Sequence, residues 1–254
     1  MTIKILLIVL LSTAFLVSKA LLANEVLVLG NQSMPFNGVI KTKYKGKITI
    51  KNSGMTYEIL EEATRHGAPV FKWKLGLPWK RAQLIIRNAG NRPIAIVPFA
   101  RIPERENSHT WIAKLFPYKV RLSTYNRATP ITIEEAKSET IGVIRATAHI
   151  SLLRSFGLNN LYEVDTAIQN AKMLKLGRFK VIAESEYVDI YNWKQLGFPT
   201  QGLQHRYLEG GGYIYIAGNQ SFPKETADKI KMAIDKMRKN GKLEEILARW
   251  RAIK

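Results

Sequence analysis

The sequence predicts an α/β fold built as two separate lobes, and three features carry this prediction. Short apolar runs alternate with segments of helical periodicity, which is the pattern of β-α-β units. The alternation is interrupted over the link Phe116–Leu122 and starts again beyond it. A glycine-rich crossing, Glu209–Gly212, then precedes one strand and two helices, which are too small to form a domain of their own. We therefore expect two mixed sheets flanked by helices and joined by two hinge crossings.

The first lobe is predicted from three apolar strands and two helices. The expected strands are Glu25–Leu29, Val70–Leu75 and Ile94–Phe99. A polar turn at Gly30–Ser33 follows the first of them. One helix is expected over Gly54–Arg65, where apolar residues share a face. Another opens at Pro78 and stops at Gly90, because proline suits the first turn of a helix and glycine its end.

The second lobe repeats the alternation with its own capping signals. The expected strands are Ile141–Ile144, Leu161–Val164 and Lys180–Ala183. Residues suited to helix starts precede four helices, and they are the capping boxes Thr132/Glu135 and Thr166/Gln169 together with Thr147 and Ser185. The chain then returns through a strand at Tyr213–Ala217 and two amphipathic helices that begin at Pro223 and end near Trp250. We assign residues 24–119 and 213–254 to the first lobe and 120–212 to the second.

The N-terminus has the features of an export signal. Lys4 gives a positive start, Ile5–Val17 is an apolar run too short for a comfortable membrane span, and small residues follow up to Ala23. We expect residues 1–23 to be a cleaved signal peptide, with a retained membrane anchor as the alternative. The chain has no cysteine, which excludes disulfides, a lipid-bearing cysteine and thiolate zinc sites.

The chain is strongly basic. Its formal charge is +19, or +17 without Lys4 and Lys19, and such a surface attracts anionic ligands, lipid headgroups or nucleic acid. The lysines are scattered, and no stretch repeatedly alternates them with aromatic residues. We therefore expect a solvated basic surface and no nucleic-acid partner, with a module that binds anionic surfaces as the alternative.

Two segments suggest a binding cleft. Ile94–Glu106 begins as an apolar strand and breaks into a turn with Arg101 and Arg105. Thr140–Leu153 also begins as a strand, and Thr147 is then placed to cap the helix that follows. A capped helix start offers free N–H groups to anions, as do guanidinium groups. Because the segments belong to different lobes, we expect them to face each other across a cleft that holds a small acidic or zwitterionic molecule.

Six short motifs in order resemble one protein family. They are Gly54–Leu60, Pro78–Ala82, Ala100–Glu106, Gly142-Val143 with Ala146-Thr147, Leu176–Arg178, and Asn240-Gly241 with Ile246–Trp250. The sequence resembles extracellular solute-binding protein family 3, the periplasmic polar amino-acid receptors of ABC transporters, over nearly the whole chain after residue 23. The resemblance implies a type II periplasmic two-lobe fold, a periplasmic location, a membrane ABC permease as partner, a monomeric state and no cofactor or metal.

The resemblance also implies roles for particular residues. Arg105 takes the place of the arginine that clamps the ligand carboxylate, with Arg101 as an extra guanidinium. Thr147 takes the place of the threonine in the second lobe, although Ala146 replaces the usual glycine before it. Trp79 takes the place of the aromatic residue that stacks on the ligand.

Other positions depart from the family pattern. Ser33 stands where an aromatic residue is usual, and Pro98 lies where hydroxyl residues usually precede the clamp. The aspartate that receives the ligand ammonium falls near Ser185, beside Glu184 and Glu186. These departures leave an amino acid and an organic acid as equal candidates for the ligand.

Catalytic motifs are missing, and we expect no enzymatic activity. There is no G-x-S-x-G, P-loop or H-E-x-x-H motif, and the four histidines lack metal-ligand spacing. His149 is expected to face solvent. Two alternatives remain: a periplasmic dehydratase on the same fold, with Glu184 or Glu186 as general acid, and a sensor module that does not serve transport.

Overall fold

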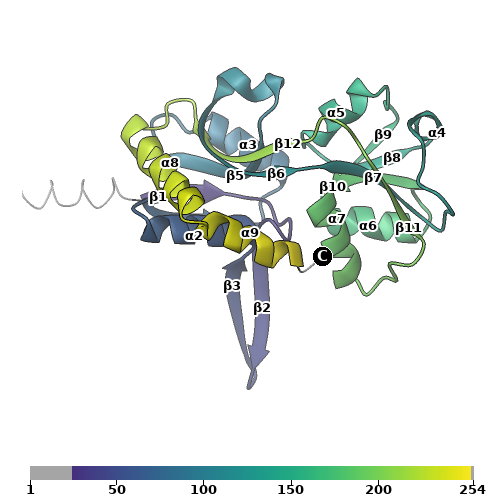
Figure 1. Cartoon of the computed structure of the whole chain (residues 1–254), viewed down its shortest axis with the longest axis horizontal. Coiled ribbons are helices and arrows are strands. Elements are labelled where there is room, and N and C mark those ends of the chain that lie inside the picture. The colour runs from purple at the N-terminus through teal and green to yellow at the C-terminus, as the bar shows by residue number, and fades with distance from the viewer. Residues whose placement is uncertain (1–24, 253–254) are drawn as a thin grey trace, which may run out of the picture.

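Two five-stranded sheets organise the chain, one in each lobe (Figure 1). The computed structural model describes residues 25–252, so the predicted signal peptide at residues 1–23 lies outside the described residues. The first sheet has the strand order β4-β1-β5-β12-β6, and the second has the order β11-β7-β10-β8-β9. The predicted two-lobe α/β class is confirmed. Within residues 25–252, no helix combines the length and apolar character needed to cross a membrane.

Lobe 1 is a mixed sheet with helices on its faces. Its strands are β1 (Glu25–Leu29), β4 (Val70–Lys74), β5 (Ile94–Ala100), β6 (His109–Tyr118) and β12 (Gly212–Asn219). The first three run parallel, and β12 inserts antiparallel between β5 and β6. Its helices are α2 (Met55–Arg65), α3 (Trp79–Arg87), the 3₁₀ turn η1 (Pro103–Ser108), α8 (Lys224–Lys239) and α9 (Lys242–Ala252). Helices α2, α8 and α9 pack against one another, while α3 packs on β5 and β12.

Lobe 2 is built in the same manner. Its strands are β7 (Val120–Tyr125), β8 (Ile141–Ile144), β9 (Leu161–Val164), β10 (Val181–Ser185) and β11 (Leu203–Tyr207). Its helices are α4 (Ile133–Lys137), α5 (His149–Ser155), α6 (Ala167–Lys175) and α7 (Glu186–Gln195). The predicted capping box of Thr132 and Glu135 is present. The hydroxyl of Thr166 accepts the backbone N–H of Gln169, but the Gln169 side chain accepts the N–H of Asp165, so the predicted capping box at Thr166 is only half formed.

Strands join the lobes where the sequence predicts a link. Residues 116–118 end β6 and residues 120–122 begin β7, so only Lys119 lies between the two strands. Backbone pairing on both sides carries the chain across Phe116–Leu122 as a nearly continuous ribbon. The return crossing, residues 208–211, runs beside it. A Cβ on Gly211 would lie 2.5 Å from the Tyr118 carbonyl oxygen, so this close approach requires glycine.

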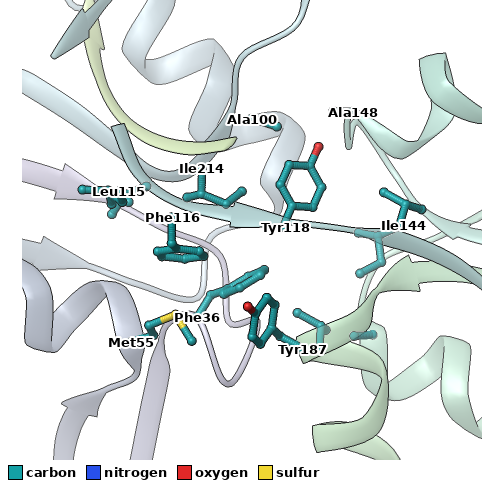
Figure 2. Packing of buried hydrophobic residues seen from close by; sticks show 14 of the residues in the cluster. Phe36, Met55, Ala100, Leu115, Phe116, Tyr118, Ile144, Ala148, Tyr187 and Ile214 are labelled. Carbon is teal, nitrogen blue, oxygen red and sulfur yellow. The ribbon is translucent and has the colours of Figure 1, made fainter. Parts of the chain in front are cut away.

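The apolar core continues from one lobe into the other. Phe36 of lobe 1 lies 5.6 Å from Phe116 and 5.8 Å from Tyr187 of α7 between ring centroids. Figure 2 shows these rings gathered between the lobes, with the Tyr118 ring rising between Ala100 and Ala148. The lobes are thus packed against each other on one side of their boundary.

A hairpin that the sequence analysis did not predict projects from lobe 1. Strands β2 (Gly38–Tyr44) and β3 (Lys47–Ser53) pair only with each other and extend away from both lobes (Figure 1). Lys45 and Gly46 form its turn with positive φ angles of 45° and 79°, as a two-residue hairpin turn requires.

Candidate functional site

A cavity of about 60 Å³ lies between the lobes, beside the shared apolar core. Lobe 1 contributes Asn31, Ser33, Phe36, Trp79, Pro98, Ala100, Arg105, Tyr118 and Ile214. Lobe 2 contributes Ile144, Thr147, Ala148, His149, Glu184, Ser185 and Val188. The candidate ligand-binding residues Ser33, Trp79, Arg105, Thr147, Glu184 and Ser185 therefore line one cavity, although they come from segments up to about 150 residues apart.

Arg105 is the charged group of this cavity and reaches across it. It lies in η1 and is only 9% exposed. Its guanidinium donates to the carbonyl of Ala100 (3.0 Å) in its own lobe and to that of Ala146 (3.1 Å) in lobe 2, with Gln83 Oε1 at 3.3 Å. Burial lowers the pKa of Arg105 to about 10, so the group stays charged at neutral pH. Three bonds leave two of the five guanidinium donors for other partners.

Arg101 does not join Arg105, although the sequence led us to expect both in the cleft. Its guanidinium is exposed, bonds to the carboxylate of Glu106 and lies over the rings of Trp111 and Tyr215. The bond to Glu106 raises the pKa of Arg101. The physical reason is local, because the 3₁₀ turn carries Arg105 inward and leaves Arg101 beside an acidic neighbour on the surface.

Trp79 and Ser33 form part of the lobe 1 wall. Trp79 is the first residue of α3 and is buried, and its ring lies 6.0 Å from that of Phe99 in an edge-on arrangement. Ser33 is also buried, and its backbone pairs with that of Asn37 in a tight turn. Trp79 is therefore both a core residue and a cavity residue.

Thr147 lines the cavity but does not cap a helix. Helix α5 begins at His149 with Ala148 as its N-cap, and the Thr147 hydroxyl donates to the carbonyl of Ile144 (2.7 Å). The predicted cap at Thr147 is therefore wrong. The reason lies in the preceding residue: Ala146 has a φ of 59°, a left-handed turn that delays the helix by one residue. This turn presents the Ala146 carbonyl to Arg105 and to Gln83 Nε2 (2.9 Å).

Glu184, Ser185 and His149 form the polar wall of lobe 2. Glu184 and Ser185 end β10, and both are buried. Ser185 occupies the N-cap position of α7, but its side chain makes no capping bond, so the predicted cap is incomplete. His149 is buried against the cavity, which makes the prediction of a solvent-facing histidine wrong. Its Nδ1 lies 3.8 Å from Glu184 Oε1.

Within residues 25–252, four atoms of the cavity wall are buried without a hydrogen-bond partner. They are Asn31 Oδ1, His149 Nδ1, Glu184 Oε2 and Ser185 Oγ. Leaving such an atom unpaired costs about 1–3 kcal/mol, so native proteins pair most of them with protein, water or ligand. The cluster therefore marks the place where an additional polar molecule would be stabilised.

The charges of the cavity are set by burial. Burial raises the pKa of Glu184 to about 8 and lowers that of His149 to about 4, an effect that the positive charge of Arg105 strengthens. At neutral pH the carboxyl of Glu184 is therefore mainly protonated and His149 is neutral. Arg105 remains as the charged group among the lining residues, so the cavity favours an anionic group. No group of three or more potential metal-binding side chains lies within the described part of the chain.

The sequence analysis missed Asn31 and Tyr118 of the cavity wall, and it missed Gln83, which bonds to Arg105. Asn31 and Tyr118 follow from no motif, and Gln83 was read only as part of a helix. Gln83 lies one turn beyond Trp79 on α3, so its position on the same face was a usable signal. Tyr118 lies where β6 leaves lobe 1, and only the topology of the crossing places it at the cavity.

Comparison with known proteins identifies the fold. No protein-family model matches the sequence, and no curated protein does. Among solved structures, the amino-acid ABC transporter substrate-binding protein AbpA of Streptococcus pneumoniae, bound to L-arginine, is 12% identical with a TM-score of 0.74, covering 91% of this chain and 96% of that one. The arginine-, lysine-, histidine-binding protein ArtJ of Geobacillus stearothermophilus is 18% identical with a TM-score of 0.70, covering 89% and 94%.

A sensor protein shares the same architecture. A histidine kinase sensor domain with similarity to periplasmic binding proteins is 14% identical with a TM-score of 0.76, covering 89% of this chain and 95% of that one. At these identities the likeness shows the fold, which is that of type II periplasmic binding proteins. The resemblance read from the sequence thus agrees with its structural neighbours, which include amino-acid transport and sensor proteins.

Proposed function

We propose that this chain is an exported solute-binding protein that closes its two lobes on a compact molecule bearing a carboxylate, either an amino acid or an organic acid. The observation that carries the proposal is the composition of the cavity. One wall presents the buried guanidinium of Arg105, and the walls together hold four unpartnered polar atoms. A carboxylate matches the planar donors of a guanidinium, and further polar groups of the ligand would satisfy the opposite wall.

The size of the cavity limits the ligand. One water molecule requires about 10–15 Å³ by the same measure, so 60 Å³ accommodates roughly four to six non-hydrogen atoms. This volume holds a small amino acid or a short hydroxy or keto acid, and a longer side chain would extend into the adjoining hollow of about 400 Å³, which shares Asn31, Ser33 and Ile144 with the cavity. If the ligand carries an ammonium group, Glu184 would ionise to receive it. If it carries only acid or hydroxyl groups, the protonated Glu184 would donate a hydrogen bond.

Capture would proceed by rotation of the lobes about their two crossings. In an open form, Arg105 and Trp79 of lobe 1 would meet the ligand first. Rotation near Lys119 and Gly210–Gly212 would then bring Thr147, Ser185 and their neighbours onto its other end. Differential contact with the closed form would shift the population towards it.

Delivery to a membrane ABC permease completes the proposal. We also propose that the protein is a periplasmic monomer whose lobes divide at residues 119/120 and 212/213. The fold that this chain shares with the amino-acid ABC transporter substrate-binding protein AbpA supports this reading.

The proposal is tested by ligand-induced thermal stabilisation. A panel of the standard amino acids and of small mono- and dicarboxylates is screened, and a compact carboxylate is expected to raise the melting temperature. Arg105→Ala should abolish that rise, because hydrogen bonds to charged groups are worth about 10- to 100-fold in affinity. Arg101→Ala is the matched control and should keep it, since Arg101 lies outside the cavity. Equal behaviour of the two variants, or a panel without any stabilising acid, contradicts the proposal.

Glu184 favours one second candidate, an enzyme of the dehydratase kind on the same fold. A buried carboxyl whose pKa is raised to about 8 holds its proton at neutral pH, as a general acid must. Turnover decides between the two functions. If a cyclic carboxylic acid identified in the screen is converted, and Glu184→Gln still binds it but no longer converts it, the enzyme is the correct function. If the bound acid is recovered unchanged, the chain acts as a binding protein and not as an enzyme.

A further inference from the structure

The hairpin of β2 and β3, residues 38–53, has the composition of a surface-binding element. Five of its residues are lysines and none is acidic. The lysines are Lys41, Lys43, Lys45, Lys47 and Lys51, all exposed. Among the described residues, no carboxylate forms an ion pair with any of them. The charge of the hairpin is therefore not neutralised within the protein, in contrast to the many paired lysines and arginines of α8 and α9.

Apolar side chains lie between these lysines. Tyr44 at the tip is 74% exposed, and Ile48 and Ile50 are 63% and 60% exposed. Ile40 is exposed as well. An isolated two-stranded hairpin is only marginally stable. The exposed isoleucines do not stabilise this one, because the fold does not bury them. These side chains therefore point to a partner.

The cross-strand register places both kinds of residue on both faces of the hairpin. Opposed residues share a face, so one face carries the pairs Ile40/Lys51 and Tyr44/Lys47. The other face carries the pairs Lys41/Ile50 and Lys43/Ile48. Each face of the hairpin therefore carries both apolar and positively charged side chains.

This two-faced arrangement favours one kind of partner. A protein surface would cover one face of the hairpin and leave the isoleucines of the other in water. A nucleic acid would leave the aliphatic side chains without a partner. A lipid headgroup region surrounds an inserted tip on all sides, attracts lysine through anionic phosphates and accepts aliphatic and tyrosine side chains at its inner boundary.

We propose that the hairpin docks this protein on an anionic phospholipid surface through its tip, residues 43–48. The contact is shallow, because the free edges of β2 and β3 carry backbone groups that hydrocarbon could not satisfy. Lysine stems extend along the apolar boundary while their ammonium groups meet phosphates. The proposal is independent of the cavity and of any ligand in it.

The test measures binding to vesicles of phosphatidylcholine with about one-third phosphatidylglycerol, at low salt. All variants are produced with the same N-terminus, which mass spectrometry establishes. Lys43→Gln/Lys45→Gln/Lys47→Gln should weaken binding about a hundredfold, since each lysine near the surface is worth about fivefold. The matched control, Lys172→Gln/Lys236→Gln/Lys239→Gln, removes the same charge from exposed helical sites and should lose less than about threefold. Equal losses in the two variants overturn the proposal.

A second measurement reports on depth and is independent of hairpin stability. Because the chain has no cysteine, Tyr44→Cys and Met232→Cys each give a single site for an environment-sensitive fluorophore. Both positions are exposed, at 74% and 55%. The emission of the label at position 44 should shift to the blue on anionic vesicles, and high salt should reverse the shift. Pure phosphatidylcholine should leave this emission unchanged, and the label at position 232 should not respond to either kind of vesicle. If position 44 stays in a polar environment, or if an oligonucleotide or acidic protein binds with the same dependence on the three lysines, the lipid assignment is wrong.

Discussion

Two buried carboxyl groups of lobe 2 stand five residues apart and have opposite surroundings. Asp189 in α7 accepts hydrogen bonds from Arg121 Nε (2.8 Å) and from the hydroxyl of Ser123. Glu184 at the end of β10 accepts only the backbone N–H of Ser185 (2.8 Å), and its other oxygen has no partner. Asp189 thus has a charged partner inside the protein, whereas Glu184 lies at the cavity wall with one oxygen unpartnered among the described residues.

The difference teaches how a buried polar group can be recognised as structural or functional. Asp189 also leaves one oxygen without a partner, as Arg121 leaves one Nη, but their opposite charges offset each other. Glu184 has no cation in bonding contact, so burial raises its pKa to about 8 and the group stays protonated. We infer that Asp189 serves the fold of lobe 2 and that Glu184 is kept for a ligand.

Asp189→Ala should produce the largest loss of stability. The change leaves the guanidinium of Arg121 buried without its carboxylate, which costs about 3–5 kcal/mol of unfolding free energy. Urea unfolding followed by circular dichroism measures the loss. Asp165→Ala is the control, because Asp165 pairs with Arg145 on the exposed surface and should cost less than about 1 kcal/mol. Similar losses for both variants would show that the buried pair does not stabilise lobe 2.

Glu184→Gln should change the pH dependence of stability in a definite direction. The unfolded chain releases the Glu184 proton near pH 4.5, whereas the folded protein holds it up to about pH 8. Between these values the folded state binds more protons, so the free energy of unfolding falls as the pH rises. One pKa unit corresponds to about 1.4 kcal/mol, which makes the total fall a few kcal/mol.

Glutamine keeps the shape of the side chain and cannot ionise, so the variant should lack this part of the fall. Urea unfolding at a series of pH values from 5 to 8.5 compares the two proteins, which should differ most at the alkaline end, by the few kcal/mol that the native protein loses over this range. Parallel curves for the native protein and Glu184→Gln would mean that Glu184 is ionised in the fold.

Much of the alternation of strands and helices could be read from the sequence, because the elements that were predicted carry local signals. Pro78 with Gly90, and Thr132 with Glu135, fixed helix ends by backbone chemistry alone. The cavity walls could be anticipated in part, since Arg105 and Thr147 follow buried strands and Glu184 lies at the end of one, and strand ends in α/β sheets meet at one edge.

The remaining features depend on contacts between distant residues. Arg101 and Arg105 look alike in the sequence, and only the geometry of η1 separates the buried from the exposed guanidinium. The pairing of Arg121 with Asp189 joins residues 68 positions apart. The hairpin was not predicted because its apolar residues fall on both faces, so residues 38–53 show no one-sided alternation. Lys45-Gly46 was a turn signal that could have been used.

The backbone of the cavity wall gives the smallest predicted effect. Ala146 holds a left-handed conformation, which costs an L-residue about 1–2 kcal/mol and costs glycine almost nothing. Glycine loses about 0.5–1 kcal/mol through its greater freedom in the unfolded chain. Ala146→Gly should therefore raise the unfolding free energy by up to about 1 kcal/mol. Its carbonyl stays in place for Arg105 and Gln83.

The matched control for this change is Ala171→Gly in the middle of α6. There the backbone is helical, and the same substitution should lower stability by about 1 kcal/mol. Urea midpoints of the two variants, compared with the native protein, give the sign of each effect. If Ala146→Gly is destabilising like Ala171→Gly, the left-handed turn is not strained. If it is stabilising, the backbone of the lobe 2 cavity wall is strained at Ala146. This strain and the Glu184 carboxyl group, which burial keeps protonated, then set the cavity wall apart from the Arg121–Asp189 ion pair.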